Sequence, residues 1–120
     1  MPMLIEKPTI IKPAGNKAKI IEEYIGMVNS ATTEVSIAKM KSPSGWEEPP
    51  QTPEFNEYTL VLKGELSIKT EKGNFVVKAG QAFIAAKGEK VQYSTFGSED
   101  AEYIAVCVPA FTEDTVNRAG

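Results

Sequence analysis

The stretch GWEEPPQTPEFNEYTLVLKG, residues 45–64, decides the fold of this chain, together with a second stretch, GQAFIAAKGEKVQYST, residues 80–95. In the first stretch, Gly45 and Gly64 flank a proline-rich loop and the apolar run Glu57–Lys63. In the second, glycines separate short apolar runs in the same way. Glycine and proline at such intervals interrupt regular structure, so both stretches predict short strands joined by tight turns.

The rest of the chain repeats this pattern of short strands and turns. Met3–Ile11 is interrupted by Pro8 and suits an edge strand or an arm, because proline cannot donate to a β-ladder. Lys19–Met27 has apolar residues at helical spacing, yet a strand is favoured because both of its neighbours look like β-structure. Thr112 is expected to cap a short helical turn that ends at Val116. The other predicted strands are Glu34–Met40, Glu57–Lys63, Leu66–Thr70, Phe75–Lys78, Ala82–Ala86, Val91–Thr95 and Glu102–Val108.

Length and composition indicate one globular domain. The 120 residues can bury a single core, and a hydrophobic content of 42% with 24% charged residues is ordinary for such a domain. We expect one domain over residues 1–120, with an N-terminal arm or edge strand at 1–15 and the barrel core at 34–108. No helix long enough to join parallel strands is predicted, so the fold class is all-β.

Several classes of protein are disfavoured by the same composition. The formal net charge of −3 argues against nucleic acid, because phosphate binding needs a basic surface. No apolar run approaches the ~18 residues that span a bilayer, and Met1–Pro8 lacks the apolar segment of a signal peptide. Cys107 is the single cysteine, which leaves no internal disulfide and suits a reducing compartment. We therefore expect a cytoplasmic protein that binds neither nucleic acid nor membranes.

The spacing of particular residues in the two stretches resembles the two motifs of the cupin family. These residues are Gly45, Gln51, Pro53, Glu57 and Gly64 in the first motif, and Gly80, Ala86, Gly88, Val91 and Thr95 in the second. The resemblance implies a single-domain cupin jelly-roll β-barrel, to which the chain adds the short helical turn near its C-terminus. Two further stretches, 51–57 and 109–117, are similar to the ethanolamine-utilisation group of small cupins, whose members also lack the metal-binding histidines.

The positions that usually hold a metal in cupins carry unusual residues here. Gln51, Pro53 and Val91 stand where the family usually has histidine, and Glu57 stands at the position of the carboxylate ligand. The chain contains no histidine at all. A tightly held transition metal needs three or four good donors, and these four positions supply one. We therefore expect no metal and no other cofactor.

A hard cation bound by oxygen atoms is a second interpretation of the proline-rich loop. Glu47, Glu48 and Glu54 lie close to Glu57 in the sequence, and carboxylates are suitable ligands for such an ion. Solvated charge on a loop is the favoured interpretation of the first three residues, and a weakly held cation near them is left open.

Strand alternation predicts the lining of a cavity inside the barrel. If Glu57 faces inward, so does Thr59, and the inward side of Val91 is shared by Tyr93 and Thr95. Such a pocket would be mostly apolar with a few hydroxyl groups, as is typical of small-molecule sites. The predicted ligand-binding residues are Trp46, Gln51, Glu57, Thr59, Val91, Tyr93, Thr95 and Tyr103. Trp46 is open to three interpretations, namely a lid over the cavity, a contact with a partner subunit and a plain packing residue.

Glu57 is the residue on which the functional hypotheses depend. We expect Tyr93 and Gln51 to donate to it, and burial to raise its pKa. It could then bind a polar metabolite or serve as an acid or base. A satisfied polar residue in a barrel that does no chemistry is an equal alternative. By contrast, Cys107 is expected to be a buried, inert thiol, and Arg118 is assigned no catalytic role because it lies close to the C-terminus.

Three functions remain open on these grounds. The favoured one is a metal-free barrel that binds a small metabolite in an accessory or sensor role, because no second well-placed titratable group is evident. The alternative is a metal-independent isomerase, epimerase or lyase that uses Glu57 and Tyr93 as acid and base. A purely structural dimeric module is the third. Leu60 and Leu62 point away from Glu57, and with the Met3–Ile11 arm they predict a homodimer.

Overall fold

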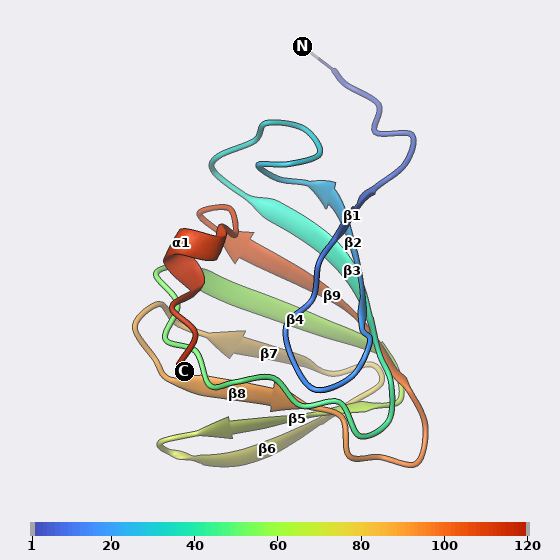
Figure 1. Cartoon of the computed structure of the whole chain (residues 1–120), viewed down its shortest axis with the longest axis vertical. Coiled ribbons are helices and arrows are strands. Elements are labelled where there is room, and N and C mark those ends of the chain that lie inside the picture. The colour runs from blue at the N-terminus through green and yellow to red at the C-terminus, as the bar shows by residue number, and fades with distance from the viewer. Residues whose placement is uncertain (1, 120) are drawn as a thin grey trace.

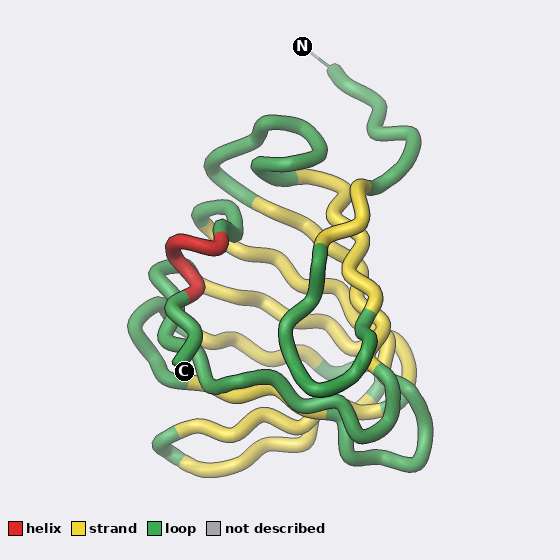
Figure 2. The backbone as a smooth tube through the Cα atoms, viewed as in Figure 1, coloured by secondary structure: helices red, strands yellow, loops and turns green. Residues whose placement is uncertain are grey.

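The computed structural model describes residues 2–119, in which nine strands form two antiparallel sheets (Figure 1). One sheet has six strands in the order β1-β2-β3-β9-β4-β7, and the other has three in the order β6-β5-β8. The bounds are β1 Thr9–Ile11, β2 Ile20–Ile25, β3 Ser36–Ser42, β4 Asn56–Lys63, β5 Glu65–Thr70, β6 Gly73–Lys78, β7 Ala82–Ala85, β8 Val91–Ser94 and β9 Ala101–Val108. The prediction of an all-β fold is confirmed, and within residues 2–119 helix is confined to one short segment, drawn in red in Figure 2.

Most predicted strands are present, with shifts at their ends. The 19–27 segment forms β2 rather than a helix, as favoured, while the predicted Glu34–Met40 strand begins and ends two residues later as β3. Of Met3–Ile11, residues 9–11 alone pair as a strand, and they do so at the edge of the six-stranded sheet beside β2. Residues 2–8 belong to no strand, which agrees with the predicted arm.

Strand β4 has the inward and outward faces that its sequence predicts. Its inward residues Glu57, Thr59 and Val61 are buried, whereas Tyr58, Leu60 and Leu62 are between 41% and 48% exposed. Successive side chains of a strand point to opposite faces of the sheet, so a single residue, Glu57, fixes the direction of all the others. The Glu57 carboxylate therefore lies inside the molecule, and a row of apolar groups lies outside.

Gly64 is the turn residue between β4 and β5, and the structure requires glycine there. Its φ of +70° lies in the left-handed region, which favours glycine. A Cβ atom at this position would lie 2.5 Å from the carbonyl oxygen of Asp100. The close approach of these two backbone segments explains why this motif position must lack a side chain.

The core divides into two clusters of apolar side chains. The larger one fills the space between the sheets around Trp46, Val61, Leu66 and Ile68. The smaller one joins Phe55, Cys107 and Val116, with Phe111 packed against it. Residues of both clusters line the cavity described below.

The C-terminal turn forms as predicted and anchors the smaller cluster. Helix α1, Glu113–Val116, has Thr112 as its N-cap, and the Thr112 side chain accepts a hydrogen bond of 3.1 Å from the Thr115 amide. Val116 is the buried residue of α1. No helix within residues 2–119 is long and apolar enough to cross a membrane.

Candidate functional site

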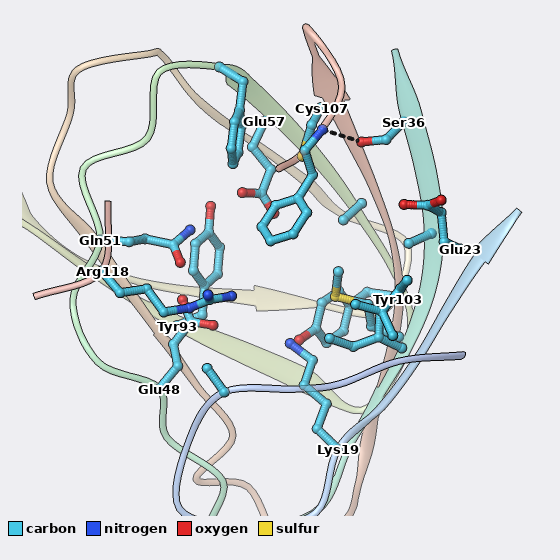
Figure 3. A pocket seen from close by; sticks show the side chains of 18 of the residues that line it. Lys19, Glu23, Ser36, Glu48, Gln51, Glu57, Tyr93, Tyr103, Cys107 and Arg118 are labelled. Atoms are coloured by element: carbon cyan, nitrogen blue, oxygen red, sulfur yellow. Dashed lines mark hydrogen bonds between the residues drawn. The ribbon is translucent and has the colours of Figure 1, made fainter. Parts of the chain in front are cut away.

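A cavity of about 60 Å³ lies between the two sheets (Figure 3). A water-sized group needs roughly 10–15 Å³ by this measure, so the space suits a molecule of a few non-hydrogen atoms. Its apolar lining includes Ile21, Ala38, Met40, Phe55, Ala105 and Phe111. Its polar and charged lining includes Lys19, Glu23, Glu48, Gln51, Glu57, Tyr93, Tyr103 and Arg118. A mostly apolar space with a few polar groups is the usual composition of a small-molecule site.

The loop between β1 and β2, which we call the covering loop (residues 12–18), lies over this cavity. It passes across the open side of the strands, next to the 43–53 loop (Figure 1). The Asn16 amide donates to the Glu47 carbonyl at 3.1 Å, and the Glu47 amide donates to the Asn16 side chain at 2.8 Å. The Trp46 indole Nε1 donates to the Ala14 carbonyl at 3.0 Å. Of the three interpretations offered for Trp46, the fully buried ring supports the packing residue, and the covering loop occupies the place of a lid.

Glu57 sits in the wall of the cavity with 9% of its surface exposed. It lies on β4 between Ala85 of β7 and Cys107 of β9. Its pKa is raised to about 7, chiefly by loss of solvation and also by the nearby Glu48 charge, while Lys19 opposes the rise. Glu57 therefore exchanges its proton near neutral pH, unlike an ordinary glutamate.

Tyr93 and Gln51 lie beside Glu57 but do not bond to it in the described residues. Both line the cavity, and Figure 3 shows the hydroxyl end of Tyr93 directed toward Gln51 and Glu57. The Tyr93 hydroxyl is buried without a hydrogen-bond partner among residues 2–119, and the hydrogen bonds predicted from Tyr93 and Gln51 to Glu57 are absent there. Burial and the charges of Glu57 and Glu48 raise the pKa of Tyr93 well above its usual value. Tyr93 can therefore donate or accept a hydrogen bond, but it does not ionise to a base.

Glu48 is a second buried carboxyl group in the same cavity, and the prediction of a solvated loop charge was wrong for it. The 46–51 segment bridges to β8 through Glu47 and Gln51, so that Glu47 points outward and Glu48, which is 8% exposed, points inward. Burial raises the Glu48 pKa to about 7, while the charges of Lys19 and Arg118 oppose that rise. Its Oε2 atom has no partner in the part of the chain that the structure describes.

Three basic residues line the cavity, Lys12, Lys19 and Arg118, and none of them is among the site residues predicted from the sequence. Lys19 is 8% exposed, and its Nζ lies 3.9 Å from the ring centroid of Trp46. Arg118 pairs with Glu113 at 2.5 Å and has a buried Nε with no partner in residues 2–119. The Arg118 backbone bridges to Gln51, and its side chain belongs to the cavity lining although Arg118 lies close to the C-terminus.

The remaining predicted residues are buried below the cavity rather than in its lining. Of the eight predicted ligand-binding residues, the lining contains Gln51, Glu57, Tyr93 and Tyr103 and omits Trp46, Thr59, Val91 and Thr95. The omitted residues are at most 2% exposed, and the hydroxyls of Thr59 and Thr95 have no partner among residues 2–119. Side-chain alternation correctly predicts that these residues face the interior, but the part of the interior in which they lie is filled by the larger apolar cluster.

The two other polar groups of the lining have local roles. The Tyr103 hydroxyl lies 2.8 Å from the Ser42 hydroxyl, and burial raises the Tyr103 pKa. Burial and the Glu57 charge raise the pKa of Cys107, which keeps this thiol protonated at physiological pH. A nucleophilic role for Cys107 has no support in this environment.

The donor set does not fit the transition metal that the cupin resemblance implies. Within residues 2–119 no three His, Cys, Asp or Glu side chains gather in a way that could hold a metal ion. Glu47 and Glu54 are exposed, whereas Glu48 is buried, so these three carboxylates do not converge on one oxygen-ligated cation.

Comparisons with known proteins give the same architecture. No family model matches the sequence. An RmlC-like cupin from Shewanella frigidimarina NCIMB 400 superimposes with a TM-score of 0.73 at 17% identity, covering 93% of this chain and 92% of its own. The EutQ protein of Clostridium difficile superimposes with a TM-score of 0.60 at 20% identity, covering 79% of this chain and 66% of its own. The cupin domain of Cnp3 from Schizosaccharomyces pombe superimposes with a TM-score of 0.66 at 14% identity, covering 76% of this chain and 61% of its own.

One curated relative is similar in sequence over part of its length. The endoribonuclease YbeY of Myxococcus xanthus (strain DK1622) is 41% identical over 93 residues. These residues are 78% of this chain but 32% of that protein. The chain therefore spans about a third of the relative, and the name of the relative describes the whole of it.

Proposed function

This chain has the cupin fold, and on that premise we propose that it binds a small polar metabolite in the cavity between its sheets, without a transition metal. Such a protein acts as an accessory or sensor component rather than through a metal-bound intermediate. The ligand is small, because the cavity holds about 60 Å³.

The observation that carries this proposal is the set of unpartnered polar groups in a mostly apolar cavity. The Tyr93 hydroxyl and the Glu48 Oε2 are both buried without a hydrogen-bond partner among residues 2–119. Leaving a buried polar group unpaired costs about 1–3 kcal/mol. A ligand that bonds to these atoms removes that cost, which gives the cavity a physical reason to bind polar molecules.

Substitution of Tyr93 by phenylalanine tests the binding proposal. A thermal-shift screen of small polar metabolites is expected to find compounds that raise the melting temperature, since a ligand at 100 times its Kd stabilises a protein by about 2.7 kcal/mol. Tyr93→Phe should weaken those compounds about tenfold, because it removes one hydrogen bond of about 1.4 kcal/mol. Tyr58→Phe, on the outer face of β4, is the matched control and should leave binding unchanged. Hits that bind equally well to Tyr93→Phe and to the cavity-filling variant Ala105→Leu would contradict the proposal.

A metal-independent enzyme is a second candidate, and the position of Glu48 favours it. With pKa values of about 7 for both Glu48 and Glu57, one cavity holds a protonated and an ionised carboxyl group at neutral pH. Isomerisation, epimerisation and lyase reactions need such an acid and base. Tyr93, the partner proposed for Glu57, would act as a hydrogen-bond donor in this scheme because it does not ionise.

Glu57→Gln distinguishes the enzyme from the binding barrel. If Glu57 transfers a proton, the variant should lose about 10²- to 10⁴-fold in turnover. Binding of a neutral ligand should weaken only modestly, since glutamine keeps the size and the carbonyl acceptor of the side chain. Turnover of a candidate substrate that stays the same in Glu57→Gln would exclude the acid–base role.

The outer face of β4 supports a homodimer. Leu60 and Leu62 are 45% and 48% exposed, Ile84 of the neighbouring β7 is 66% exposed, and Met3 and Leu4 in the arm are 69% and 83% exposed. Leu60, Leu62 and Ile84 lie on the neighbouring strands β4 and β7, and an exposed apolar patch of this kind usually lies in an interface. In sedimentation velocity, wild-type protein should run as a dimer and a Leu60→Lys/Leu62→Lys double variant as a monomer. A monomeric wild type would count against the dimer.

Binding of RNA is not favoured by the charges of this chain. The formal net charge is −3, and the lining of the cavity contains three glutamates, Glu23, Glu48 and Glu57. Phosphate backbones are bound by basic surfaces. The similarity to one third of an endoribonuclease therefore does not extend to a proposal of RNA cleavage.

A further inference from the structure

We infer that the ligand of this cavity is a small organic cation, a protonated amine, whose ammonium group lies against Glu57 and accepting oxygens of Tyr93 and Gln51. The inference rests on the proposed ligand-binding function and adds the chemical class of the ligand. Three features of the lining support it, namely the unpaired Glu57 carboxylate, the acceptors beside Glu57 and the apolar adjoining walls.

The charged groups of the lining differ in their partners. Arg118 forms an ion pair with Glu113 at 2.5 Å. The Glu23 carboxylate accepts hydrogen bonds from the amides of Val28 and Asn29 at 3.0 and 2.8 Å. Glu48 lies in the field of both Lys19 and Arg118. The Glu57 side chain takes part in no hydrogen bond or ion pair within residues 2–119, and its strongest charged neighbour is the like charge of Glu48. A ligand cation beside Glu57 would supply the partner that this carboxylate lacks.

The polar groups beside Glu57 fit the three N–H donors of an ammonium group. A carboxylate, a phenolic oxygen and an amide carbonyl are all acceptors, and Glu57, Tyr93 and Gln51 supply one of each. The Tyr93 hydroxyl is buried with no partner in the described chain, and Figure 3 shows it directed toward the other two side chains. An anion at the same place would meet two carboxyl groups instead.

The walls next to Glu57 fit the hydrocarbon part of an amine. Cys107 is the cross-strand neighbour of Glu57 and belongs to the cluster of Phe55 and Val116, against which Phe111 packs. The rings of Phe55 and Phe111 are 5.8 Å apart in an edge-to-face arrangement, and both line the cavity. Aromatic rings also attract cations through their faces. A metal ion at this place would have one carboxylate ligand among apolar walls. An alkylammonium ion would place its ammonium group against the Glu57 carboxylate and its hydrocarbon chain against the apolar walls.

Three probes of nearly equal size test this inference. Propylamine, propan-1-ol and propionate carry a positive, a neutral and a negative group on the same short chain, and each can be titrated into the full chain at pH 8 by calorimetry and thermal shift. Propylamine, which is protonated at this pH, is expected to bind about ten- to a hundredfold more tightly than propan-1-ol, because it adds a charge-assisted hydrogen bond of about 1.5–3 kcal/mol. Propionate is expected to bind most weakly.

Variants connect the preference to Glu57. Glu57→Gln should lower propylamine affinity to that of propan-1-ol and leave propan-1-ol unchanged, whereas Glu54→Gln, an exposed glutamate three residues away, should change neither. A preference for propionate, or propylamine binding that persists in Glu57→Gln, overturns the inference. If metabolites of the wider screen bind in a Tyr93-dependent way and amines do not, the inference fails while the proposed binding function stands. If no compound of any class binds, both fail.

Discussion

Glu57→Gln is expected to stabilise the folded protein by about 3 kcal/mol at pH 8 and to change its stability little at pH 4. Burial raises the Glu57 pKa from 4.5 to about 7. Between these two values the folded state keeps a proton that the unfolded state has lost, so the free energy of unfolding falls as the pH rises. The fall is about 1.4 kcal/mol for each unit of pKa difference and ends above pH 7. Glutamine resembles the protonated carboxyl group and carries no such cost.

Urea denaturation at pH 4, 6 and 8 measures this effect. The difference between wild type and Glu57→Gln should grow with pH from pH 4 and level off near pH 8. Part of the gain comes from Glu48, because the variant also removes the repulsion between the two carboxylates, while Lys19 opposes it. Glu54→Gln is the control, since that side chain is exposed. A Glu57→Gln protein less stable than wild type at pH 8 would show that the carboxylate is stabilised by partners instead.

Trp46→Ala is expected to destabilise the protein by about 3–5 kcal/mol, the usual cost of truncating a large buried aromatic residue. The Trp46 side chain is 0% exposed and lies in the larger core cluster. The substitution also removes the hydrogen bond from Nε1 to the Ala14 carbonyl, and with it one attachment of the covering loop. Both losses act in the same direction.

Thermal and urea denaturation give the size of the loss, and limited proteolysis within residues 12–18 shows whether the covering loop has been released. Phe96→Ala provides the comparison, because Phe96 is 64% exposed and its truncation should change stability by about 0.5 kcal/mol or less. If Trp46→Ala were as stable as Phe96→Ala, the ring would not be a packing residue, and the alternative of a mobile lid would have to be reconsidered.

The fold could be predicted from local signals in the sequence. Turn glycines such as Gly64 and the alternation of apolar residues along β4 depend on neighbours in the chain, and these fix strands to within one or two residues. The cap at Thr112 is another local signal, and it too agreed with the structure. The resemblance to cupins added the arrangement of the strands, which no local pattern contains.

The cavity could be predicted only in part. The alternation of side chains along a strand predicts that Glu57 and Tyr93 face the cavity. It gives the face of the strand on which a side chain lies, but not how far along the strand the cavity extends. For that reason Thr59 and Thr95 were placed in the lining although the core covers them. Glu48 reaches the cavity because its loop bridges to β8. That contact joins residues far apart in the chain, so the residues next to Glu48 in the sequence do not predict it.

Trp46 gives this protein an optical property of its own. It is the sole tryptophan of the chain, it is shielded from solvent, and the Lys19 ammonium lies 3.9 Å from the centre of its ring. Indole fluorescence responds to nearby charge and to solvent, so all of the tryptophan emission originates at one known point beside the cavity. Any molecule that displaces Lys19 on entering the cavity should change the emission wavelength or the intensity of the Trp46 fluorescence. The chain can therefore be titrated without a dye, a label or an added reporter.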